Sequence, residues 1–71
     1  MKVIIKAKFS ATKERFEDFG ANKYLLYLPF EEDEEANIAI IHLLSKHIGV
    51  PPSKIRFAGF DPHKDRVFEV L

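Results

Sequence analysis

One segment in the second half of the chain has the features of a helix whose two ends are both marked. From Asp33 to Ile48 the apolar side chains recur three and four positions apart, which places them on one face of a helix. Asp33 is a favoured capping residue, Gly49 can supply the left-handed residue that ends a helix, and Pro51 prevents continuation. The apolar positions are Ala36, Ile40, Ile41, Leu43, Leu44 and Ile48. The sequence therefore predicts a helix over residues 33–48 that packs its apolar face against another layer.

Four further segments have the composition of β-strands. Residues 3–9 alternate apolar and polar side chains, which is typical of a strand with one buried face. Residues 24–28 are aromatic and aliphatic throughout, as in a central strand that is covered on both faces. Residues 55–58 and 67–70 read as two strands joined by a segment rich in turn-forming residues. The element order is therefore β-β-α-β-β.

This order predicts a two-layer α+β fold, with one main helix packed on one face of a four-stranded sheet. A right-handed crossover between parallel second and third strands, with the fourth strand between them, gives the sheet order 1-2-4-3. Phe57 and Phe68 are expected to face the helix, because burying Arg56 or Glu69 there would be costly.

The segment between the first two strands is harder to interpret. Residues 10–22 mix charges with Phe16 and Phe19 and end in Gly20-Ala21-Asn22, which tolerates positive backbone dihedrals. We expect a loop with one helical turn. Since a single helix covers only one sheet face, the sequence leaves open whether this segment covers the other.

Length and composition narrow the class of protein. The 71 residues are enough for a single domain, residues 1–71, with a thin core. The formal net charge is zero, there is no cysteine, and no segment has the length of a membrane span, so we expect a cytoplasmic monomer without a membrane partner. Glutamine is also absent, and Lys and Glu dominate the charged residues, which is typical of proteins from thermophiles.

The same residues resemble a known family. Ala36-Asn37 at a helix start, the run 43–50 at its end, the start of a strand at residues 53–55 and Gly59 at its close are similar to the YggU-like family of small proteins, a domain of unknown function. The resemblance spans nearly the whole chain. It implies the same order of two strands, a helix and two strands, and it implies no activity. The basic-x-basic pattern that the family carries after this glycine matches Lys64 and Arg66 if the loop is one residue longer.

Asn37 is the candidate site residue on the helix, because it falls close to the centre of the apolar face. A buried amide needs partners, and we expect its side chain to bond backbone groups of the preceding loop, residues 30–33. The alternative is a contact with a ligand. Asp61, His63 and Asp65 alternate as metal ligands can, but ordinary turn chemistry explains them, and we expect no metal or cofactor.

Basic residues are the second group of candidates. Lys6, Lys8, Arg56, Lys64 and Arg66 can converge, because alternate positions of neighbouring strands share a face. With a tyrosine nearby, such a face could engage RNA. The tyrosines are Tyr24 and Tyr27.

These observations favour a non-catalytic binding or interaction module, with RNA or a protein as its partner. Apolar groups left partly exposed on an uncovered sheet face would support that role, and they are expected at Ile4, Val67, Leu71 and either Leu25 or Tyr27. The alternative is an enzyme or binding protein for a small anionic substrate near Asn37, Lys64 and Arg66.

Overall fold

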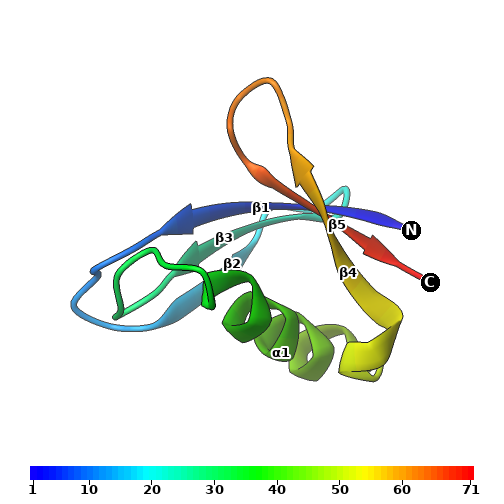
Figure 1. Cartoon of the computed structure of the whole chain (residues 1–71), viewed down its shortest axis with the longest axis horizontal. Helices are drawn as coiled ribbons and strands as arrows, with labels where there is room; N and C mark the ends of the chain where they lie inside the picture. Colours follow the sequence, from blue (N-terminus) through cyan, green and yellow to red (C-terminus); the bar gives the residue numbers. More distant parts are fainter.

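The computed structural model describes all residues from 1 to 71 and has two layers, with one helix on one face of a single sheet (Figure 1). The helix is α1, Ala36–Ile48, and a short 3-10 helix, η1, follows it at Pro52–Lys54. The strands are β1 Lys2–Lys8, β2 Arg15–Asp18, β3 Lys23–Tyr27, β4 Ile55–Phe60 and β5 Arg66–Val70. The predicted α+β class, with a helix packed on a sheet, is confirmed. The prediction of four strands is wrong, because the sheet has five.

The strands lie in the order β2-β3-β1-β5-β4. β1 pairs with β3 in parallel, and the other three pairs are antiparallel. The predicted order 1-2-4-3 is therefore wrong, since β1 and not β3 is the neighbour of the β4–β5 hairpin. The physical reason is the additional strand: β2 occupies the outer side of β3, so β3 has no free edge and the hairpin pairs with β1 instead.

β2 arises from the segment that was expected to form a loop with a helical turn. It pairs antiparallel with β3 through a tight turn in which the backbone N–H of Lys23 donates to the carbonyl of Gly20 at 3.0 Å. Gly20, Ala21 and Asn22 all have positive φ there, with values of 78°, 50° and 61°. The positive φ values at Gly20 and Asn22 agree with the prediction, but the expectation of a loop with a helical turn is wrong for residues 15–18, which form a strand.

The helix is shorter at its start than predicted. Its first residue is Ala36, and the Asp33 carboxylate accepts a hydrogen bond from the backbone N–H of Glu35 at 2.9 Å, in the turn before the helix. Its end is as predicted, because Gly49 has φ 76° and its N–H donates to the carbonyl of Ser45 at 3.0 Å. No helix in the structure combines the length and the apolar character that crossing a membrane requires.

The core lies between the helix and the sheet face that it covers. Its largest fully buried side chains are Val3, Ile5, Leu26, Leu28, Ile40, Leu44 and Phe68. Phe57 packs against this cluster, with its ring centroid 5.5 Å from that of Phe68, so both phenylalanines lie on the helix side as predicted. The core therefore combines helix-facing side chains of β1, β3 and β5 with the buried side chains of α1.

The opposite side of the sheet is called the open face below. Residues 10–22 do not cover it, because Phe16 stacks on His47 of α1 on the helix side and Phe19 is 63% exposed. Ile4 and Tyr27 are half-buried there and Leu71 is exposed, as expected. Leu25 and Val67, however, are only 8% and 9% exposed, so the prediction of exposure is wrong for Val67.

Candidate functional site

Basic side chains dominate the open face. Residues paired across neighbouring strands share a face, and the register places Lys6 beside Leu25 and Lys8 beside Tyr27, opposite the helix. Continued across all pairs, it gives six basic and two acidic residues: Lys2, Lys6, Lys8, Arg15, Lys23 and Arg56, with Glu17 and Glu69. The face therefore has an excess of four positive charges in a chain whose formal net charge is zero.

The two acidic residues do not neutralise the lysines. Glu17 accepts a charged hydrogen bond from Arg15, and Glu69 lies 3.6 Å from the N-terminal amine. None of the ion pairs involves Lys6, Lys8 or Arg56, and all three side chains are exposed. The open face thus presents unpaired cations to solvent.

Tyr27 supplies the aromatic surface of this face. Its ring is half-buried, and the guanidinium carbon of Arg15 lies 5.5 Å from the ring centroid. On the neighbouring strand β1, Lys8 is the residue paired with Tyr27. Tyr24, the other tyrosine considered, is not on this face: its ring is buried on the helix side, against Phe16 and His47.

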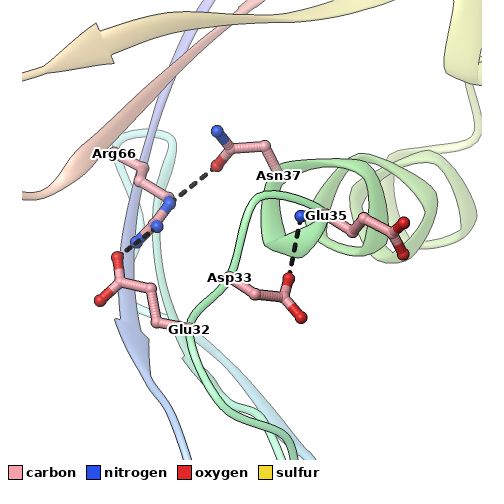
Figure 2. A network of polar contacts seen from close by, with 5 residues as sticks. All are labelled: Glu32, Asp33, Glu35, Asn37 and Arg66. Atoms are coloured by element: carbon pink, nitrogen blue, oxygen red, sulfur yellow. Dashed lines mark hydrogen bonds and ion pairs between the residues drawn. The ribbon is translucent and has the colours of Figure 1, made fainter.

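A separate polar network lies on the helix side and is centred on Arg66 (Figure 2). The Nε of Arg66 donates to Asn37 Oδ1 at 2.8 Å, and its Nη2 donates to Glu32 Oε2 at 2.6 Å. The rings of Phe9 and Phe60 each lie 5.1 Å from the guanidinium carbon. Arg66 is only 7% exposed, so one buried cation connects β5 with the helix start and the loop before it.

Two predictions about this region are wrong. Asn37 does not bond the backbone of residues 30–33, since its carbonyl oxygen accepts from Arg66 instead. Arg66 does not join Lys6, Lys8 and Arg56, because it pairs in register with the buried Ile5 and so points to the helix side. Successive residues of a strand point to opposite faces of the sheet, so a difference of one position places Arg66 on the helix side and its neighbour Val67 on the open face.

An open pocket of about 450 Å³ adjoins Arg66. Its walls are Ala7, Phe9, Glu32, Phe60, Lys64 and Arg66. Lys64 is exposed, lies in the loop between β4 and β5, and forms no ion pair. That loop stands out from the rest of the sheet (Figure 1). The structure therefore brings Lys64 and Arg66 to one pocket, with Asn37 behind Arg66, and places Lys6, Lys8 and Arg56 on the opposite face.

The acidic and imidazole side chains of the same loop form a turn. The Asp61 carboxylate accepts hydrogen bonds from the backbone N–H groups of His63 and Asp65, both at 2.9 Å. No group of three His, Cys, Asp or Glu side chains is placed so that it could hold a metal ion. The Asp61 side chain thus stabilises the turn of its own loop by accepting backbone hydrogen bonds.

Several residues of these two surfaces were not singled out from the sequence. Lys2 and Lys23 could have been found, because each continues the alternation of its own strand, two residues before Ile4 and Leu25. Glu32 and Phe9 could not, because nothing in their local sequence shows that they meet a residue on the last strand. No protein-family model and no solved structure matches this chain, so the resemblance to the YggU-like family stays a prediction.

Proposed function

We propose that this protein is a cytoplasmic, non-catalytic binding module that binds RNA on the open face of its sheet. One observation carries the proposal: six basic side chains share that face with two acidic ones, and both acidic side chains already have a partner. A surface of unpaired cations attracts a polyanion and releases its counterions on binding.

The chemistry of the face favours contacts with the phosphate backbone over reading of bases. Lysine ammonium groups act as mobile point charges, which suits phosphates at variable positions. Lys6 and Lys8 lie two residues apart on one strand, so their stems leave the sheet about 7 Å apart. Tyr27, between Lys8 and Arg15 in register, offers the one aromatic ring on which a base could stack.

The first prediction concerns the two lysines at the centre of the open face. Replacing Lys6 and Lys8 together by alanine should weaken binding of a short single-stranded RNA, because two phosphate contacts are lost. The slope of log K against log salt should become shallower by about 1.4, at about 0.7 per contact for single strands. Fluorescence anisotropy titrations over a series of salt concentrations measure both quantities.

Lys46 and Lys64 provide the matched control, since both are exposed, Lys46 is on α1, and Lys64 lines the pocket on the helix side. The double variant Lys46→Ala with Lys64→Ala changes the net charge equally and should leave the slope close to that of the wild type. Equal losses in the two double variants would mean that overall charge, and not the open face, governs binding. No RNA binding by the wild type at low salt would reject the proposal and favour a protein partner.

A further inference from the structure

The pocket beside Arg66 has the features of a binding site in which the protein's own glutamate occupies the ligand position. The Arg66 guanidinium is held by Asn37 at Nε, and its central carbon lies 5.1 Å from the ring centroids of both Phe9 and Phe60. Its Nη2 donates at 2.6 Å to the carboxylate of Glu32, which lines the same pocket (Figure 2). A planar guanidinium held in this way is suited to binding carboxylates.

Glu32 is a replaceable partner of this guanidinium. Its side chain is 56% exposed, and it belongs to the segment between β3 and α1, outside any helix or strand. Arg66 is anchored by contrast, because its side chain is 9% exposed and retains Asn37 and two rings without Glu32. An incoming carboxylate can therefore take the place of Glu32 while the cation stays in position.

The rest of the pocket adds a second cation and an apolar wall. Lys64 has no ion pair and lines the same pocket, so displacement of Glu32 leaves two cations and no acid among the lining residues. Ala7, Phe9 and Phe60 form the apolar part of the lining. These groups complement a small molecule that joins a carboxylate to an apolar body.

We propose that this pocket binds small organic carboxylates with an apolar body, and that Glu32 competes for Arg66 as an internal ligand. This site lies on the helix side, so the proposal does not depend on RNA binding at the open face. Removing the internal ligand should raise the affinity, because the pocket is then free for a larger fraction of the time.

Benzoate is a suitable probe, since it consists of one carboxylate on an aromatic ring. Two-dimensional amide NMR titrations of the wild type should show shifts at Phe9, Phe60 and Lys64. The Glu32→Ala variant should bind benzoate about threefold to tenfold more tightly than the wild type. Glu32→Gln, which keeps the size of the side chain, should change the affinity in the same direction and serves if the alanine variant folds poorly.

Glu31→Ala is the matched control, because Glu31 is an exposed acid one residue away with no bond to Arg66. It should bind benzoate as the wild type does, and benzamide, the neutral analogue, should shift no amide of the pocket. Lys64→Ala should weaken binding. The proposal is overturned if Glu32→Ala binds no more tightly than Glu31→Ala, or if benzoate shifts the amides around Lys6 and Lys8 instead.

Discussion

A buried guanidinium must recover the hydration that it loses, and Arg66 does so with three kinds of contact. It donates to a neutral amide and to a carboxylate, and it lies against two aromatic rings. The carboxylate is half-exposed, so that ion pair is screened and contributes little by itself. The amide oxygen of Asn37 is the partner whose position is fixed, because it stands on the first turn of α1.

The second prediction follows from the role of Asn37 as an acceptor. Asn37→Ala should lower the free energy of unfolding by about 1 to 3 kcal/mol, because Arg66 Nε loses its partner in a buried position. Asn37→Asp should stay within about 0.5 kcal/mol of the wild type at neutral pH, since a carboxylate also accepts and suits a helix start. Urea denaturation measures both. If the aspartate variant is as unstable as the alanine variant, the NH₂ group and not the oxygen of Asn37 is the one that matters.

At the scale of elements, β2 is held at the edge of the sheet by one aromatic contact with the helix. The Phe16 ring stacks on His47 near the end of α1, with centroids 4.1 Å apart and planes 22° apart. Tyr24 of β3 completes the cluster, at 5.1 Å from Phe16 and 5.4 Å from His47. A strand of four residues forms few ladder hydrogen bonds, so this packing is what positions it.

The third prediction tests that contact. Phe16→Ala should destabilise the protein by about 2 kcal/mol, less than a fully buried phenylalanine would, because the ring is half-buried. Phe19→Ala is the control in the same segment, since Phe19 is 63% exposed and its loss should change stability by less than about 0.5 kcal/mol. Chemical denaturation of both variants decides. Equal effects would show that β2 is held by its backbone alone.

The helix and four of the five strands could be predicted because each has a local signal. The helix has a repeating apolar face and a glycine at its end, and β1 alternates, with Val3 and Ile5 buried and Ala7 half-buried on the helix side. β2, with the sequence Arg-Phe-Glu-Asp, has one apolar residue and no alternation, so only its pairing with β3 reveals it. The prediction of the strand order was wrong for the same reason, because the order depends on the presence of β2 beside β3.

The two candidate sites differ in the same way, because only one of them has a local sequence signal. The open face follows from alternation, which is why Lys6, Lys8 and Arg56 could be placed on one surface. The bond between Arg66 and Asn37 joins residues 29 positions apart on different elements, and that with Glu32 spans 34. No local sequence pattern specifies contacts between residues so far apart in the chain. The residue types could suggest an anion site, but the arrangement of the pocket could not be predicted.

For the whole molecule, the fourth prediction is high thermal resistance. The chain has neither cysteine nor glutamine, it is rich in lysine and glutamate, and prolines follow its main helix closely. We expect a calorimetric melting midpoint above about 65 °C, the upper end of the range in which mesophilic domains cluster. A midpoint of about 45 to 65 °C would contradict the prediction.

The separation of charge between the two layers gives the molecule an electric dipole although its formal net charge is zero. The positive end is the open face, and the negative end is the acidic segment that leads into α1, residues 31–35. In the field of a polyanion such a molecule experiences a torque, which turns the open face forward before any contact forms. For a polyanionic partner, the electrostatic contribution to encounter is therefore orientation on approach, and not net attraction over distance. This orienting effect disappears as the Debye length falls below the width of the domain.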